Sequence, residues 1–243
     1  MTSRVRRAFL AAPAEGTRAV LDPEESHHVA RVLRARAGET LAVFDGRGGE
    51  WSATVDAIAG ERVTVLVGPP ADGVVEPRLR VVLHQAIVRP EKLEWVLQKG
   101  TELGVAAFRL IETERGERAP SAARLARYER IAMEACKQSG RRVVPAVDAA
   151  GRPQTPPPGV LALALHTSPD AAPLAALLAG APAKEVWIAI GPEGGFAPGE
   201  IAALVDAGWR PASLGPRTLR TETAGAVAAA IVLHAWGDLG SIL

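Results

Sequence analysis

The sequence predicts an α/β protein in which a small β domain precedes a larger domain built on a parallel sheet. Up to residue 72, short strand-like runs are separated by glycine-rich turns. Later apolar runs alternate with helical patterns, which favours a parallel sheet covered by helices on both faces. The segment 68–73 lacks periodicity and is rich in turn residues, so we place the domain boundary there. The expected domains are 1–72 and 73–243.

The expected first domain is a small β-barrel with one helix. Its predicted strands are 41–45, 50–57 and 62–67. The helix should begin at Pro23, because Asp22 can cap it and Glu25 follows three residues after the cap. Gly38 should follow its far end.

The second domain should alternate strands with helices. Its predicted strands are 79–88, 105–111, 160–166 and 185–190, and its predicted helices are 90–103, 121–139, 170–179, 198–207 and 221–236. The segment 149–159 contains four prolines and is expected to be a loop.

Composition excludes several classes of protein. The 243 residues carry 28 basic and 27 acidic side chains, so no global charge indicates a nucleic-acid partner. Cys136 is the single cysteine, which excludes an intrachain disulfide and a cysteine-rich zinc site and fits a reducing compartment. No apolar run approaches the ~20 residues of a membrane-spanning helix. We therefore expect a cytoplasmic protein with no metal site and no membrane partner.

The most specific motif is Gly191-Pro192-Glu193-Gly194-Gly195, directly after the strand 185–190. Ligands of open parallel sheets bind beyond the carboxyl ends of the strands. Glycines there let the backbone approach a ligand and leave amide groups free to bind it. The alternative is an ordinary turn. The spacing fits neither the dinucleotide fingerprint nor the phosphate-binding loop of nucleotide hydrolases.

A second motif, Leu214 to Ala224, lies between a short strand and the last helix. Thr221 can cap that helix, and its first amides would then face the ends of the strands. A plain helix start explains the threonines but not Arg217 and Arg220, which suit a substrate phosphate or negative charge on a base.

A basic stripe is predicted on the first-domain helix. His27, Arg31 and Arg34 are spaced i, i+4 and i+7, whereas Val29, Val32 and Leu33 lie on another side and can pack. A solvated surface is the alternative explanation. Metal binding is not favoured, because adjacent His27 and His28 point apart on a helix.

Several motifs in order give the chain a family resemblance. Besides the two loops they are His27-His28-Val29, Arg31 to Arg34, Gln98-Lys99, Thr101 to Gly104, Glu114-Arg115, Gln138, Gly140-Arg141, Pro145 and Gly237 to Gly240. Along nearly its whole length the chain resembles the RsmE-type 16S ribosomal RNA uridine-N3 methyltransferases of the SPOUT superfamily.

The resemblance implies a PUA-like barrel that helps bind RNA, followed by a SPOUT domain whose chain forms a trefoil knot. It also implies a homodimer through the C-terminal domain and S-adenosylmethionine held bent by the knot loops. Carried over by position, the cofactor-binding residues would be Leu165, His166, Ile190, Gly191, Pro192, Glu193, Gly194, Gly195, Leu214, Gly215, Leu219, Arg220, Thr221, Thr223 and Ala224. The RNA-binding candidates are Arg7, His27, Arg31, Arg34, Arg115 and Arg141.

The expected substrate is 16S ribosomal RNA within the small subunit. Methylation of uracil N3 requires that the ring proton leaves and that the base is unpaired or flipped into the site. Alignment of N3 with the methyl group would then supply much of the acceleration. Glu193 and Glu222 are both candidate proton acceptors, and the sequence does not distinguish them. Arg220 is the candidate for balancing charge on the uracil oxygens, with Arg7 reaching in from the barrel.

Two other functions remain compatible with the sequence. One is a SPOUT ribose 2'-O-methyltransferase, against which the barrel and the full set of motifs argue. The other is a non-catalytic RNA-binding module in ribosome assembly, which would not bind S-adenosylmethionine.

Overall fold

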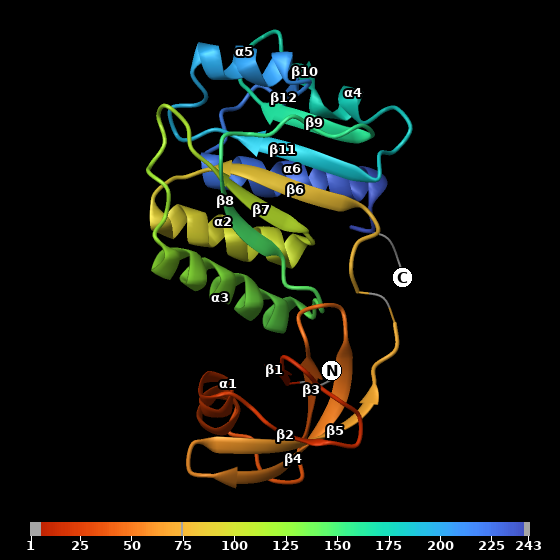
Figure 1. The fold of residues 1–243 in the computed structure, drawn as a ribbon. Coiled ribbons are helices and arrows are strands. Elements are labelled where there is room, and N and C mark those ends of the chain that lie inside the picture. Colours follow the sequence, from red (N-terminus) through yellow and green to blue (C-terminus); the bar gives the residue numbers. More distant parts are fainter. Residues whose placement is uncertain (1–5, 74, 241–243) are drawn as a thin grey trace. The chain divides into compact units, whose positions relative to one another are not determined.

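The computed structural model describes residues 6–73 and 75–240 and divides the chain into two compact units. The first unit comprises Met1–Glu76 together with Cys136–Val144, and the second comprises Pro77–Ala135 and Pro145–Leu243 (Figure 1). The first unit thus extends beyond residue 72. It also includes a segment, 136–144, that the sequence pattern assigns to the second domain.

The first unit is built on a mixed sheet with the strand order β1-β3-β4-β5-β2. Its strands among the described residues are β1 (Arg7–Phe9), β2 (Arg18–Val20), β3 (Thr40–Phe44), β4 (Glu50–Ala59) and β5 (Arg62–Pro70). β1 runs parallel to β3, and the other pairs are antiparallel. The three predicted strands are present as β3, β4 and β5. β1 and β2 have three residues each, too few to show a periodic pattern.

The first-domain helix begins as predicted but ends early. α1 (Pro23–His27) is capped by Asp22, whose side chain accepts a 2.8 Å hydrogen bond from the Glu25 amide. A π-helical turn, η1 (His28–Val32), follows, and the helix does not continue to Gly38. A wider turn changes the phase of the side chains that follow it. Val32 is accordingly 62% exposed, and the expectation that it packs inward is wrong.

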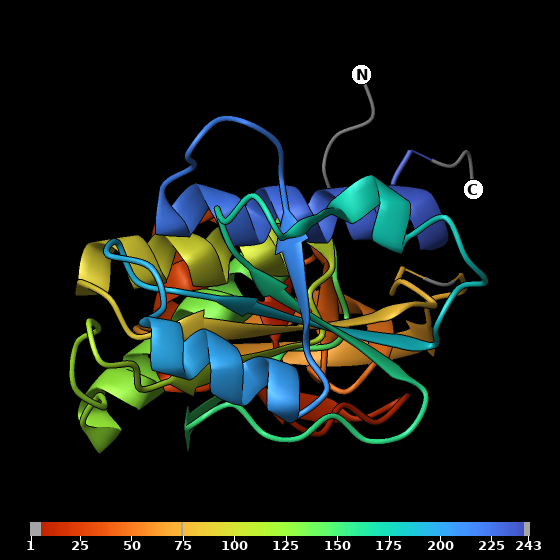
Figure 2. The same ribbon diagram turned by 90° about the horizontal axis from the view of Figure 1, so that it is seen from above.

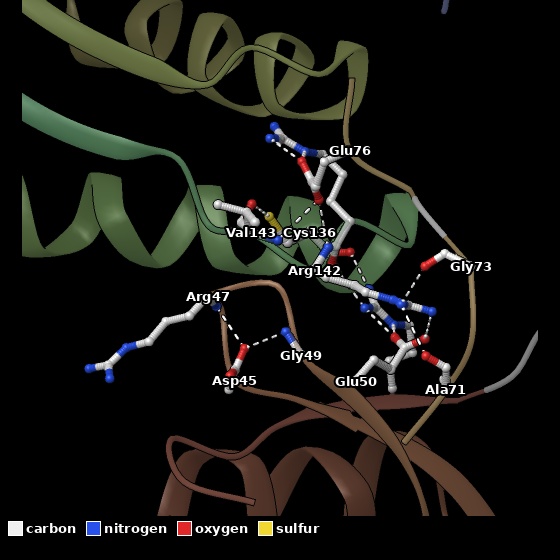
Figure 3. Close-up of polar contacts among 12 residues, drawn as sticks. Asp45, Arg47, Gly49, Glu50, Ala71, Gly73, Glu76, Cys136, Arg142 and Val143 are labelled. Carbon is white, nitrogen blue, oxygen red and sulfur yellow. Dashed lines mark hydrogen bonds and ion pairs between the residues drawn. The ribbon is translucent and has the colours of Figure 1, made fainter. Parts of the chain in front are cut away.

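Buried ion pairs hold the segment 136–144 in the first unit. Lys137 donates to Glu25 at 2.5 Å, and both side chains are almost fully buried. Arg142 donates to the carbonyls of Ala71 and Gly73, while its own amide donates to Glu76 (Figure 3). Removing either member of a buried pair leaves an uncompensated charge, so these contacts resist opening.

Two arginines expected to serve RNA or catalysis belong to this network. Arg7 is buried and donates to the Glu50 carboxylate and to the carbonyls of Cys136 and Arg141. Arg141 is buried too and donates twice to Glu76, at 2.9 and 2.7 Å. Protein acceptors already occupy these guanidinium groups, which disfavours a catalytic or RNA-binding role for Arg7 and an RNA contact for Arg141; both roles stay predictions.

The second unit is built on a fully parallel sheet with the order β10-β12-β9-β11-β6-β7-β8. Its described strands are β6 (Arg80–Ala86), β7 (Ala107–Ile111), β8 (Ala146–Gly151), β9 (Val160–Leu165), β10 (Ala172–Pro173), β11 (Glu185–Ile190) and β12 (Arg210–Ser213). β8 overlaps the loop predicted at 149–159, because a short edge strand with a single valine among Ala, Asp and Gly carries little strand signal. The trefoil knot stays a prediction, since strand order does not define how the chain crosses itself.

Helices cover both faces of this sheet, as the alternating pattern predicts (Figure 2). They are α2 (Pro90–Leu103), α3 (Ala122–Ser139), α4 (Leu174–Leu177), α5 (Pro198–Asp206) and α6 (Thr221–Trp236). α2 packs against α6, and α5 lies on the opposite face. α4 is much shorter than the predicted helix 170–179.

A buried histidine lies on the α5 side of the sheet. His84 of β6 packs between Trp187 and Trp209, with ring centroids 4.7 and 5.0 Å away, and neither ring nitrogen has a hydrogen-bond partner among the described residues. Burial, with a smaller contribution from nearby Arg109, lowers the pKa of His84 to about 4. The neutral imidazole therefore serves as a packing group.

Replacing this histidine should make stability less sensitive to acid. Below pH ~6.5 an unfolded imidazole takes up a proton, whereas folded His84 stays neutral until pH falls to about 4. The wild type therefore loses stability over that range, and His84→Phe should lose about 2 kcal/mol less between pH 7 and 4.5. Denaturant unfolding at both pH values measures this difference. Equal losses in the two proteins would contradict it.

Candidate functional site

A cavity of about 600 Å³ opens beyond the carboxyl ends of β9, β11 and β12. Its walls come from the segments that follow these strands and from the start of α6. The lining includes all the residues expected to bind a cofactor except Thr223: Leu165, His166, Ile190, Gly191, Pro192, Glu193, Gly194, Gly195, Leu214, Gly215, Leu219, Arg220, Thr221 and Ala224. The fold thus brings together three segments separated by about twenty residues or more in sequence.

Thr221 joins two of these segments. Its hydroxyl donates to the Gly191 carbonyl at 2.7 Å and accepts from the Gln85 side chain of β6 at 3.0 Å. The N-cap of α6 is Arg220, and the prediction that Thr221 caps the helix is wrong. The Thr221 hydroxyl instead ties the first turn of α6 to the loop after β11.

The loop 191–195 turns tightly and has no room for side chains at its start. The Gly195 amide donates to the Pro192 carbonyl at 2.9 Å, and Gly195 has a φ of +67°. A Cβ on Gly191 would lie 2.9 Å from the Phe196 amide nitrogen, so a side chain there would displace backbone. The Gly194 carbonyl accepts from Arg115 at 2.8 Å. Glycine at 191 is therefore a packing requirement.

A lysine that the sequence motifs do not indicate organises the charges. Lys92, in the first turn of α2, lies 2.9 Å from Glu193 and 3.8 Å from Glu222. Its hydrogen bond is the main cause that lowers the pKa of Glu193. Lys92 is about 100 residues from the first motif loop and more than 120 from the second, so no local spacing relates it to them.

The two candidate carboxylates differ in their surroundings. Glu193 lines the cavity and is half exposed. Glu222 does not line it: its side chain is 15% exposed, and its buried Oε2 has no hydrogen-bond partner within residues 6–73 and 75–240. Arg220 also lines the cavity, is 82% exposed and lies 4.0 Å from Glu222. A ligand in the cavity could therefore contact Glu193 and Arg220 directly, but not Glu222.

The remaining candidate basic residues lie in two places. Arg115 lines the cavity, as does Arg217, which the sequence motif already includes. His27, Arg31 and Arg34 are exposed in the first unit. Arg34 lies beyond the end of η1, so the predicted stripe does not run along one helix.

Comparison with known proteins gives a consistent family. A model described as an RNA methyltransferase domain matches residues 75–233, and one described as an RNA methyltransferase PUA domain matches residues 21–68. The ribosomal RNA small subunit methyltransferase E of Synechocystis is 36% identical over 86% of this chain and 71% of its own. That of Mycobacterium tuberculosis is 36% identical over 89% and 86%.

Two solved structures superpose over almost the whole chain. A Legionella pneumophila methyltransferase in complex with S-adenosylmethionine has a TM-score of 0.89 and 32% identity, covering 98% of this chain and 100% of its own. The ribosomal RNA small subunit methyltransferase E of Neisseria gonorrhoeae, bound to the same cofactor, has a TM-score of 0.89 and 30% identity, covering 97% and 99%.

Removal of the Thr221 hydroxyl should destabilise the protein. In Thr221→Val the side-chain volume is nearly kept, but the buried Gly191 carbonyl and Gln85 amide each lose a partner. The expected cost is about 1–3 kcal/mol of unfolding free energy, measured by denaturant titration. Thr221→Ser keeps the hydroxyl and should stay within about 1 kcal/mol of the wild type. A loss in Thr221→Val no larger than the loss in Thr221→Ser would contradict the prediction that the hydrogen bonds outweigh the methyl group.

Proposed function

Since the chain belongs to the RNA methyltransferase family, we propose that it transfers the methyl group of S-adenosylmethionine to N3 of a uridine in 16S ribosomal RNA. The observation that carries the proposal is the convergence of the three predicted cofactor segments on one cavity. Relatives that superpose over nearly the whole chain have S-adenosylmethionine bound, which supports the choice of cofactor.

The residues of the cavity suit this cofactor. Its volume falls in the usual range for small-molecule sites. Leu165, Ile190 and Leu219 offer apolar surface for an adenine ring, and the glycines of the 191–195 loop let backbone groups approach the cofactor closely. When bound, S-adenosylmethionine supplies a methyl group activated by a positively charged sulfur.

Glu193 is our proposed acceptor of the N3 proton. It lines the cavity, and its carboxylate, whose pKa Lys92 lowers, is ionised near neutral pH and can therefore accept a proton. Glu222 lies behind Lys92, and its charge helps to hold that lysine in place. Arg220, exposed at the cavity, balances negative charge on the uracil oxygens. The uridine must be unpaired to reach these groups.

RNA contacts are proposed for His27, Arg31 and Arg34 on the first unit and for Arg115 beside the cavity. Exposed cations of this kind bind phosphates by releasing counterions from the RNA. We place the reaction in the cytoplasm, on RNA within the small ribosomal subunit. Among the described residues, no helix has the length and apolarity needed to span a membrane.

The decisive experiment is incubation of the protein with methyl-labelled cofactor and small subunits from a strain that lacks it. Mass spectrometry of digested RNA should find N3-methyluridine. Label on a ribose would favour 2'-O-methylation, and calorimetry that detects no cofactor binding would favour a non-catalytic RNA-binding module.

A substitution in the glycine loop should weaken cofactor binding. In Gly191→Ala the new methyl group forces the backbone at Phe196 to move. We expect S-adenosylmethionine to bind at least about tenfold more weakly by calorimetry, equivalent to about 1.4 kcal/mol. Gly199→Ala in α5 is the matched control, since its Cβ meets open space and the residue does not line this cavity. An unchanged affinity in Gly191→Ala would mean that this loop does not contribute to cofactor binding.

The two glutamates should differ in their effect on turnover. Glu193→Gln keeps the shape but removes the proton acceptor, and kcat should fall about 100-fold, with cofactor affinity within about threefold of the wild type. Glu222→Gln should lower kcat less. Single-turnover methylation with saturating RNA measures both. A larger loss in Glu222→Gln would reverse the assignment.

The protein should be a homodimer through its second unit. The described part of α6 is rich in alanine, which permits close helix packing, and Ile231 on it and Trp95 on adjoining α2 expose large apolar side chains. Light scattering at micromolar concentration should give twice the mass of the chain. A monomeric mass would refute the dimer.

A further inference from the structure

The segment that follows β7 is a loop fastened at both ends. The Glu112 amide donates to the carbonyl of the last residue of β8 at 2.6 Å, and the Glu117 amide donates to the carbonyl of the residue after β6 at 2.8 Å. Glu114 and Arg115 lie between these two anchors. Their positions therefore depend on what holds the middle of the loop.

Glu200, in the first turn of α5, holds the middle of this loop. One oxygen of its carboxylate accepts a hydrogen bond from the Ala197 amide, and the other accepts one from the Glu114 amide, both at 2.8 Å. The first bond satisfies an amide at the start of the helix, which is the usual task of a glutamate at this position. The second reaches a residue 86 positions away, and helix capping does not require it.

Arg115 carries the connection on to the glycine loop. Its guanidinium donates to the Gly194 carbonyl at 2.8 Å, and a Cβ on Gly194 would lie 3.2 Å from its Cδ. The amide of the same peptide group belongs to Gly195 and donates to the Pro192 carbonyl at 2.9 Å. Both polar ends of this peptide are thus bound. Because glycine lies on either side of it, the peptide could rotate if one of these bonds were lost.

Glu200 does not face the cavity that holds the motif loops. That cavity is lined by Arg115 and Gly194 but not by Glu200. Glu200 and Glu114 instead line a separate cavity of about 560 Å³, formed by α5 and the segments after β7 and β8. Any effect of Glu200 on a ligand of the first cavity must therefore pass through its neighbours.

We propose that Glu200 is a positioning residue for the cofactor. By binding the Glu114 amide it keeps Arg115 on the Gly194 carbonyl, and this series of contacts, here termed the brace, holds the glycine loop in the conformation that binds S-adenosylmethionine. A protein that adopts its binding conformation only part of the time binds more weakly in proportion. This inference rests on the proposed function and adds to it a carboxylate outside the cavity.

Glu200→Gln separates the brace from the helix cap. Glutamine keeps one oxygen for the Ala197 amide, but its NH2 group cannot accept from the Glu114 amide. S-adenosylmethionine should bind about fivefold more weakly by calorimetry, while the midpoint of thermal unfolding stays within about 3 °C of the wild type. Asp206→Asn, which removes an exposed carboxylate from the end of the same helix, is the matched control and should change the affinity less than about twofold.

A double-mutant cycle tests whether Glu200 acts through Arg115. Arg115→Ala should also weaken cofactor binding, and the double variant should bind within about twofold of the weaker single variant, because both substitutions break one brace. The assay contains no RNA, so the RNA contact proposed for Arg115 does not enter.

Three results would overturn the brace. They are fold-changes that multiply in the double variant, an unchanged affinity in either single variant, and a Glu200→Gln protein that loses thermal stability but not affinity, as a purely structural residue would. If the wild type itself did not bind S-adenosylmethionine, the proposed function would fail and the brace with it. Binding by the wild type with an unchanged affinity in Glu200→Gln would remove the brace alone.

Discussion

The hydrogen bonds of Thr221 are the constraint on which the cavity depends. One hydroxyl connects β6, through Gln85, to the loop after β11, through the Gly191 carbonyl. Because both partners are buried, loss of the hydroxyl leaves polar groups with no water to replace it. These hydrogen bonds therefore fix the distance between the start of α6 and the glycine loop. The absence of a side chain at Gly191 lets the loop close onto Phe196, and the cavity remains beyond it.

Charge near the cavity is arranged around a single lysine. Lys92 comes from the first turn of α2 and lies between a carboxylate that lines the cavity, Glu193, and a largely buried one, Glu222. The ammonium group of Lys92 lies within ion-pair distance of both carboxylates, so one lysine compensates both charges. The consequence for chemistry is a division between the two glutamates. One can meet a substrate, and the other supports the group that keeps the first ionised.

In the first unit, burial separates structural cations from those available to a ligand. Arg7 and Lys137 are bound to carboxylates. The desolvation cost of these buried charges is offset only while each cation stays in contact with its carboxylate. They fasten residues 136–144 to the β domain. Arg31 and Arg34 are exposed and have no ion-pair partner in the described part of the chain, which suits a polyanion. Arginine count alone does not reveal this difference, which explains why Arg7 and Arg141 were plausible RNA ligands by sequence.

The sequence by itself determined the α/β class, the bounds of α2 and α6 and two of the loops that line the cavity, because periodicity and glycine-rich motifs are local signals. The third cavity segment, Leu165 and His166, was expected only from the family resemblance. Tertiary structure alone decided the rest. Lys92 meets Glu193 only because α2 and the 191–195 loop lie at the same edge of the sheet, and Arg7 is buried only because residues 136–144 return to the first unit. The π-helical turn at His28–Val32, beside buried Val29, has no local signal in the sequence. These are contacts between residues distant in sequence or constraints of packing, and local sequence patterns predict neither.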